Sequence, residues 1–301
     1  MFPRVSVIIP TYNRWPMVGE AVESVLEQTC ANIELIVVDD GSTDDTVARL
    51  GTYGTRLRVI SQERKGVSAA RNTGARAARG ALLAFLDSDD LWCAGKLDRQ
   101  TRFMELHPEI FISQTEEIWI RHGVRVNPRA IHRKPAGDIF FPSLKLCLVS
   151  PSAVMLRRAL FDASGGFDEA LPVCEDYDLW LRIAIDYQVA LIPEPLVIKR
   201  GGHADQLSHS LWGMDRYRVA ALQKLLRSGM VGARRQAVLD TLRDKVRILA
   251  QGARKRGREG DALEYEAKLS EFDKESGDVG RDDSRLCPGE GLSPTNARAL
   301  A

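Results

Sequence analysis

Two aspartates, Asp87 and Asp89, stand two positions apart directly after an apolar run, Ala81 to Leu86. Residues two apart on an extended backbone point to the same side, so both carboxylates could reach one ion. Carboxylate oxygens suit a hard divalent cation, and water or phosphate oxygens can complete its shell. The plain alternative is that these acids only cap the next helix, as Asp90 could. Because short motifs often occur by chance, these residues alone leave both interpretations open.

A second acidic cluster, residues 39–44 (DDGSTD), follows the apolar run Leu35 to Val38. Here Asp39 or Asp40 could accept hydrogen bonds from a nucleoside base or ribose, whereas the plain interpretation is a helix-capping turn. An acid at this place is also typical of dinucleotide-binding dehydrogenases. Their glycine-rich phosphate turn is absent, because the loop after the first strand reads PTYNR over residues 10–14. The sequence therefore disfavours a dehydrogenase.

Both clusters follow predicted strands of an alternating βα pattern. Val5 to Ile9 is a β-branched apolar run that Pro10 ends, and apolar residues with helical spacing follow from Val18 to Leu26. Further apolar runs alternate with helical stretches at 35–38, 57–60 and 81–86. This pattern predicts an α/β fold with a Rossmann-like, mostly parallel sheet flanked by helices. Ligands of such sheets bind at the carboxyl ends of the strands, where both clusters lie.

The rest of the chain divides by pattern into three parts. Beyond about Leu91 the alternation weakens, and scattered strands predict a mixed second half that completes one domain over residues 1–215. Residues 216–275 have the apolar spacing of helices and predict a helical C-terminal segment. Residues 276–301 are rich in Gly, Asp, Ser and Pro, and we expect them to be disordered.

Composition limits the partners and the compartment. The 42 basic and 41 acidic residues nearly cancel to +1, which does not favour nucleic acid as a partner. Five cysteines without CxxC spacing indicate a reducing compartment. No apolar run reaches the length of a signal peptide core or a membrane span, so we expect a cytoplasmic protein. Peripheral contact with the inner face of the membrane stays open, as does the oligomeric state.

Four N-terminal segments together resemble the inverting family 2 glycosyltransferases of the GT-A fold. They are residues 5–13 (VSVIIPTYN), 37–44 (VVDDGSTD), 66–72 (GVSAARN) and 85–90 (FLDSDD). Residues 165–168 (GGFD) and 174–182 (CEDYDLWLR) resemble the acceptor-side motifs of the same family. The resemblance covers about Arg4 to Ser210. It implies a nucleotide-binding half over residues 1–92 and an acceptor-binding half over residues 93–215.

The resemblance also implies how a nucleoside-diphosphate sugar would be bound. Tyr12 would stack near the nucleobase, Asp40 rather than Asp39 would bind its polar edge, and Asp87 and Asp89 would hold the ribose and the diphosphate-bound Mn²⁺ or Mg²⁺. Arg71 would approach the nucleotide, with a salt bridge to a surface acid as the alternative. The expected nucleotide-sugar-binding residues are Pro10, Thr11, Tyr12, Asn13, Asp39, Asp40, Arg71, Asp87 and Ser88.

Two further roles depend on the resemblance. His203 would lie near the metal or diphosphate, and an exposed loop histidine is the equal alternative. Asp176 would be the general base that takes the proton of the attacking acceptor hydroxyl, while Glu175 would orient it or contact the acceptor. Outside the family context, adjacent acids like these are usually capping or solvated. One base without an obvious covalent nucleophile implies a single displacement with inversion.

The resulting expectation is an enzyme that transfers a sugar to a glycan, lipid-linked or protein acceptor in cell-surface glycan synthesis. UDP is the expected nucleotide because it is the commonest donor in the family. The alternatives are a noncatalytic sugar-nucleotide or glycan-binding module of the same fold and, less favoured, a sugar-phosphate nucleotidyltransferase. Basic residues of the stretch 111–150 could meet a phosphate-bearing acceptor, although a solvated face is the plainer interpretation: Arg121, Arg125, Arg129, Arg133 and Lys134.

Overall fold

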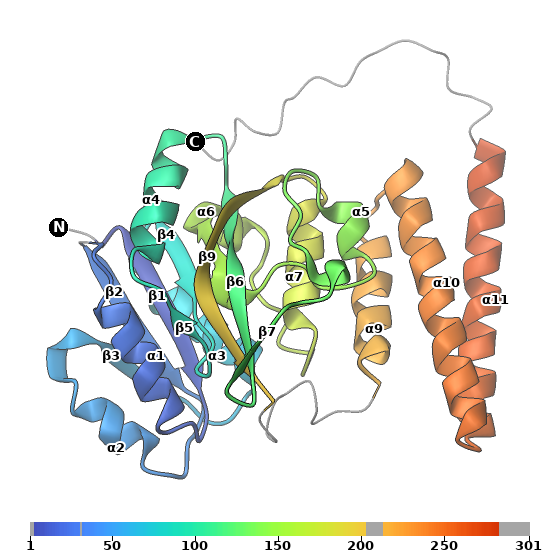
Figure 1. Ribbon diagram of the computed structural model, residues 1–301. Coiled ribbons are helices and arrows are strands. Elements are labelled where there is room, and N and C mark those ends of the chain that lie inside the picture. Colours follow the sequence, from blue (N-terminus) through green and yellow to red (C-terminus); the bar gives the residue numbers. More distant parts are fainter. Residues whose placement is uncertain (1–2, 31, 203–212, 283–301) are drawn as a thin grey trace. The chain divides into compact units, whose positions relative to one another are not determined.

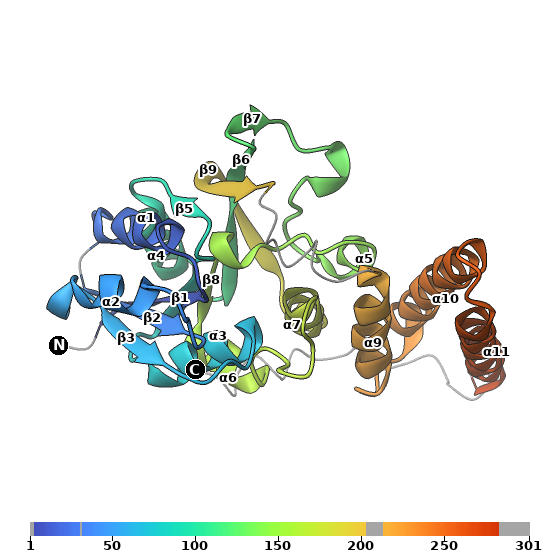
Figure 2. The same ribbon diagram turned by 90° about the horizontal axis from the view of Figure 1, so that it is seen from below.

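The protein is described by a computed structural model over residues 3–30, 32–202 and 213–282. The chain forms two compact units, Met1–Leu211 and Trp212–Ala301. In Figures 1 and 2 the first unit carries all the labelled strands, and the second carries α9 to α11. The predicted site residues of the described chain all belong to the first unit.

The N-terminal half of the first unit is a parallel sheet with the order β3-β2-β1-β4. Its strands are β1 (Val5–Thr11), β2 (Ile33–Asp39), β3 (Arg58–Ser61) and β4 (Leu82–Phe85). The connecting helices are α1 (Met17–Leu26), α2 (Thr46–Gly51) and α3 (Val67–Ala77), with a short 3-10 turn at Gly54–Arg56. Every residue of β1 is buried, because helices cover both faces of the strand. The βα alternation expected from the sequence is confirmed.

The second half of the unit continues the sheet in mixed directions as β4-β8-β6-β9-β5. Its strands are β5 (Leu91–Trp92), β6 (Ile112–Arg121), β7 (Val124–Val126), β8 (Val154–Arg157) and β9 (Val189–Gly201). Strand β8 pairs antiparallel with β4 and β6, while β6 and β9 are parallel. The α/β class is confirmed, and the parallel pairing expected of most of the sheet prevails in its N-terminal half.

Helices and short turns cover this second half. They are α4 (Lys96–Leu106), α5 (Phe140–Ser143), α6 (Arg158–Ala163) and α7 (Glu175–Ala184), with 3-10 turns at Ala130–His132 and Pro151–Ala153. Strand β9 includes two apolar stretches, residues 189–192 and 196–198, in one continuous strand. Pro193 and Pro195 interrupt the apolar pattern there, and the pairing with β6 shifts register at the same point.

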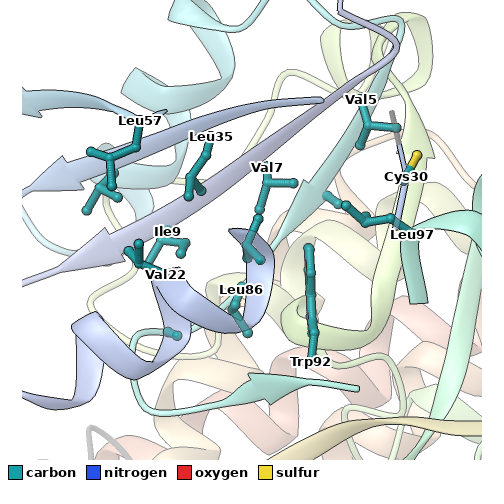
Figure 3. Packing of buried hydrophobic residues seen from close by; sticks show 14 of the residues in the cluster. Val5, Val7, Ile9, Val22, Cys30, Leu35, Leu57, Leu86, Trp92 and Leu97 are labelled. Atoms are coloured by element: carbon teal, nitrogen blue, oxygen red, sulfur yellow. The ribbon is translucent and has the colours of Figure 1, made fainter. Parts of the chain in front are cut away.

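A hydrophobic cluster packs against the N-terminal half of the sheet and holds the strands whose ends carry the predicted site residues. Figure 3 shows Val5, Val7 and Ile9, alternate residues of β1, in this cluster with Val22 of α1 and Leu86 after β4. All five side chains are fully buried. Burial of each such side chain stabilises the fold by about 1.5–3 kcal/mol. The loops at the strand ends therefore extend from a rigid base.

The second unit consists of α9 (Met214–Leu226), α10 (Gly232–Lys255) and α11 (Glu259–Asp282). Buried leucines such as Leu222, Leu239 and Leu242 form its interior. Helix α11 includes residues 276–282, which the sequence analysis placed in a disordered tail; residues 283–301 lie outside the described chain. None of the described helices combines the length and apolarity needed to cross a bilayer.

Candidate active site

Four loops, which follow β1, β2, β3 and β4, meet at the carboxyl end of the parallel sheet. Thr11 at the end of β1 pairs with Asp39 at the end of β2, and Ile8 pairs with Phe85 at the end of β4. The loops that follow these strands border a pocket of about 400 Å³. It is lined by Pro10, Thr11, Tyr12, Asn13, Arg14, Asp40, Arg64, Gly66, Val67, Ala70 and Ser88. The predicted nucleotide-binding residues Asp39, Arg71 and Asp87 are not among the lining residues.

An aromatic and a guanidinium group stack in this pocket. The guanidinium carbon of Arg64 lies 3.9 Å from the centre of the Tyr12 ring, and its Nη1 donates a hydrogen bond of 3.0 Å to the Tyr12 hydroxyl. Both groups are planar and can stack with a flat nucleobase. Arg64 was not predicted from the sequence, because the pairing of strands that are distant in the chain brings it close to Tyr12.

Asp40 is buried and holds the turn that leads into α3. Its Oδ1 accepts hydrogen bonds from Gln62 Nε2 (2.7 Å) and the Lys65 backbone N–H (2.9 Å), and its Oδ2 accepts one from the Gly66 N–H (2.8 Å). A carboxylate offers about four acceptor sites, so Oδ2 retains capacity toward the pocket. The expected contact with the edge of a base stays a prediction.

Asp39 and Asn13 both stabilise the loops around the pocket through hydrogen bonds to backbone N–H groups. Asp39 accepts from the backbone N–H of Ser42 at 3.2 Å, the turn role that the sequence analysis considered. The side-chain oxygen of Asn13 accepts from the Thr43 N–H at 2.7 Å, and its backbone has a φ of +48°. Asn13 therefore ties the loop after β1 to the loop after β2.

Arg71 links Asp87, which follows β4, to Glu175 at the start of α7. From α3 its Nη2 donates to Asp87 Oδ1 (2.7 Å) and its Nη1 to Glu175 Oε1 (2.6 Å), with only 3% of the residue exposed. Burial lowers the pKa of Arg71, but the charges of Asp87 and Glu175 outweigh it and hold the pKa above its ordinary value. Arg71 therefore forms salt bridges with the half-buried Asp87 and the buried Glu175, and its expected approach to the nucleotide stays a prediction.

Asp87 and Asp89 form the candidate metal site. Burial and the charge of Asp87 raise the pKa of Asp89, although Arg14 lies 3.5 Å from the Asp89 carboxylate and opposes the shift. A bound cation would relieve this repulsion, so the two oxygen donors fit a hard divalent ion. The described residues contain no group of three or more His, Cys, Asp or Glu arranged to hold a metal. His203, the third predicted ligand, lies outside the described residues.

Asp90 joins the strands around these acids and is not a helix cap. It accepts hydrogen bonds from Ser152 Oγ at 2.7 Å and from the Arg200 backbone N–H at 2.9 Å, whereas Gly95 precedes α4. Ser152 Oγ also accepts from the Asp87 N–H at 3.1 Å. Burial raises the pKa of Asp90 to about 7. The capping role considered for Asp90 is therefore wrong.

The expected base and its neighbour begin α7. Asp176 Oδ1 accepts from the Tyr177 N–H at 2.7 Å, and Cys147 Sγ lies 3.4 Å from Asp176 Oδ2. Burial, with a contribution from the charge of Asp176, raises the pKa of Glu175 to about 7 against the opposing charge of Arg71. Glu175 is thus held by Arg71, while Asp176 has a thiol donor beside it.

Lys199 of β9 lies close enough to feel the charges of both Asp87, a predicted metal ligand, and Asp176, the expected general base. Burial lowers its pKa, but the charges of Glu117, Asp90, Asp87 and Asp176 outweigh burial and hold the pKa above its ordinary value. Its Nζ donates a hydrogen bond of 3.2 Å to Ser150 Oγ. The fold therefore surrounds Lys199 with acidic side chains.

The curated relatives of the chain include glycosyltransferases. The chain is 36% identical over 196 residues to an uncharacterized glycosyltransferase of Rickettsia felis, covering 64% of this chain and 32% of the relative, so it spans about a third of that relative's length. It is 35% identical over 193 residues to WfgD of Escherichia coli, a UDP-Glc:alpha-D-GlcNAc-diphosphoundecaprenol beta-1,3-glucosyltransferase, covering 62% of this chain and 72% of WfgD.

Solved structures share the fold. Residues 1–349 of S. aureus TarS in complex with UDP-GlcNAc match with a TM-score of 0.64 and 18% identity, over 89% of this chain and 92% of that chain. The mannosyltransferase PcManGT of Pyrobaculum calidifontis, in complex with GDP-Man and Mn²⁺, matches with a TM-score of 0.60 and 21% identity, over 90% and 84%. These likenesses support the expected GT-A type of α/β fold, with its helical C-terminal segment.

The family model for glycosyl transferase family 2 matches residues 6–164, more than half of the 301 residues. The matched range includes both strand-end acidic clusters and the pocket that they border. The family model and the curated relatives agree, and this chain belongs to glycosyl transferase family 2.

Proposed function

We propose that the protein is an inverting, metal-dependent glycosyltransferase that moves a sugar from a UDP-sugar to a hydroxyl of a lipid-linked glycan acceptor. The observation that carries the proposal is the position of Ser88. This residue lines the pocket beside Tyr12 and Asp40, and it is the middle residue of Asp87-Ser88-Asp89. A nucleotide stacked on Tyr12 would therefore direct its diphosphate toward the two carboxylates.

The names of the relatives support the donor and the acceptor. WfgD uses UDP-glucose and a diphosphoundecaprenol-linked sugar, and TarS has been solved with UDP-GlcNAc. PcManGT has been solved with a GDP-sugar and Mn²⁺, which supports a metal in this fold. For this chain we propose UDP as the nucleotide and synthesis of a cell-surface glycan as the setting.

In the proposed mechanism the chain's residues bind, orient and move a proton. Tyr12 and Arg64 hold the nucleobase. Asp87 and Asp89 would hold the divalent cation, which would supply positive charge to offset the negative charge that grows on the leaving diphosphate. Asp176 takes the proton of the acceptor hydroxyl as that oxygen attacks the anomeric carbon. Attack from the face opposite the diphosphate gives inversion.

The first test compares Asp176→Asn with the wild type in a UDP-sugar transfer assay that uses a diphosphate-lipid-linked acceptor. Loss of the general base is expected to lower kcat by about 10²–10⁴-fold. UDP binding is expected to remain, because Asp176 is not among the residues of the nucleotide pocket. Asp186→Asn, near the far end of the same helix, serves as the matched control. Unchanged transfer by Asp176→Asn would refute the base assignment.

A further inference from the structure

One exposed segment of the first unit differs in charge from the rest of the chain. We call residues 118–137 the basic hairpin; it comprises the outer part of β6, the strand β7 and the turn Ala130–His132. It contains no aspartate or glutamate, whereas the whole chain balances 42 basic against 41 acidic residues. Its arginines are Arg121, Arg125, Arg129 and Arg133, of which the last three are exposed.

The exposed arginines and the buried lysine of this segment differ in how their charges are paired. Among the described residues, no carboxylate forms an ion pair with any of the four, whereas Lys134 of the same segment is buried against Glu117 at 2.9 Å. Within the described chain, the buried Lys134 is therefore paired with an acid, while the exposed arginines of the segment face solvent. An uncompensated basic surface of this kind attracts anionic partners.

Exposed aliphatic side chains alternate with the arginines. Val124 is 65% exposed and Ile131 is 62% exposed, although water solvates neither favourably. In the same segment the ring centre of Trp119 lies 5.1 Å from that of His132 and 5.3 Å from the guanidinium carbon of Arg121. Arginines beside exposed aliphatic groups and an aromatic ring are typical of surfaces that meet the headgroup layer of a bilayer.

The hairpin protrudes and yet begins at the candidate site. Figure 2 shows β7 and the chain after it outside the body of the sheet, at the top of the view. At its base Trp119 pairs with Lys199, the residue that the acids of the site surround. A surface that held the hairpin would therefore lie next to the acceptor side of the site.

We propose that the basic hairpin docks the protein on an anionic lipid bilayer, with its arginines at the headgroups and with Val124 and Ile131 in the interfacial layer. Charge complementarity identifies the occupant, since the surface joins uncompensated cations to apolar groups. A soluble polyanion would use the arginines and leave the aliphatic groups in water. This docking is a binding event of its own and goes beyond the proposed transfer reaction.

The test is flotation of the full chain with vesicles of phosphatidylcholine alone and of phosphatidylcholine mixed with phosphatidylglycerol. We expect the wild type to bind only the mixed vesicles and to dissociate at high salt. The variant Arg125→Gln/Arg129→Gln/Arg133→Gln is expected to bind on the order of 100-fold more weakly. The matched control, Arg58→Gln/Arg99→Gln/Arg102→Gln, removes three exposed arginines elsewhere in the unit and is expected to bind as the wild type does.

A second variant, Val124→Ser/Ile131→Ser, keeps the charge and is expected to weaken vesicle binding several-fold. Equal vesicle binding by the wild type and the triple hairpin variant would overturn the proposal. So would binding to soluble inorganic polyphosphate without binding to mixed vesicles. Thermal unfolding shows whether each variant is folded, and UDP binding by the hairpin variant should persist, which separates failure here from failure of the proposed function.

Discussion

Cys147 shows how a single side chain can act on the proposed base. Its Sγ lies 3.4 Å from Asp176 Oδ2, and burial together with the charge of Asp176 raises the pKa of the thiol well above its ordinary value. The group is therefore a protonated thiol near neutral pH and can donate to the carboxylate. Nothing in the local sequence around Cys147 indicates this contact, because the two residues are far apart in the chain.

Replacing this thiol should affect turnover more than binding. We expect Cys147→Ala to lower kcat about 3- to 10-fold with little change in KM for the donor, since one hydrogen bond to the base is lost. Cys147→Ser keeps a donor and should recover part of kcat. The pH profile of kcat should shift in Cys147→Ala and not in Cys93→Ala. Equal kcat values and pH profiles for Cys147→Ala and the wild type would show that the thiol does not position Asp176.

The buried pair of Glu117 and Lys134 predicts a pH dependence of stability. Burial raises the pKa of Glu117, but the charge of Lys134 outweighs it and lowers the pKa from 4.5 to about 2. Because the folded pKa is lower than the ordinary value, the pair's contribution is complete above pH 4.5 and is lost as pH falls toward 2. Stability in this window should decline less steeply once the acid is removed.

The corresponding measurement is urea unfolding of Glu117→Gln across this pH window. At neutral pH we expect a loss of about 3–5 kcal/mol, because Lys134 stays buried without its partner. Glu117→Gln/Lys134→Met should regain much of this loss. The control Glu27→Gln removes an exposed acid and should leave the stability nearly unchanged. A Glu117→Gln protein as stable as the control would contradict the pairing.

At the scale of elements, α3 is held against β1 by the absence of a side chain at Gly74. A Cβ added there would collide with Ile8 Cγ2 and would lie 3.2 Å from Val38 Cγ2. The close approach places Arg71, one turn earlier on the same helix, between Asp87 and Glu175. The contact between α3 and β1 thus sets the position of Arg71, which joins Asp87 to Glu175.

Gly74→Ala should therefore destabilise the protein by about 1–3 kcal/mol through overpacking. Gly51→Ala, in a helix where nothing lies within 4 Å of the added Cβ, is the control and should be close to neutral. Chemical denaturation provides both values. If Gly74→Ala proved as stable as Gly51→Ala, the helix would not depend on this close approach.

The sequence predicted the elements with continuous apolar patterns and missed those that depend on long-range pairing. Most residues of β1, β2 and β4 are buried, so these strands contain apolar runs that are easy to find. Strand β9 contains Pro193 and Pro195 and has partly exposed residues, so the sequence did not predict it as one continuous strand. Tyr12 and Asp40 lie in recognisable motifs and were expected in one pocket. Arg64 lies in no such motif, and only the pairing of the strands brings it there.

At the scale of the whole molecule, one unit contains every described residue of the candidate site, and the basic hairpin extends from the same unit. The nearly neutral net charge of +1 conceals this local excess of arginine. A net charge therefore could not predict the proposed membrane contact, because its basis is the segregation of charge along the chain.

The most direct test of the account is thermal-shift binding of UDP, GDP, dTDP and CDP, each with and without Mn²⁺. The wild type, Asp89→Ala and the exposed control Asp240→Ala are compared. The account predicts that UDP with Mn²⁺ raises Tm in the wild type and in Asp240→Ala, and that this increase disappears in Asp89→Ala. An increase with UDP that needs no metal and survives in Asp89→Ala, or no increase with any nucleotide in folded protein, would contradict it.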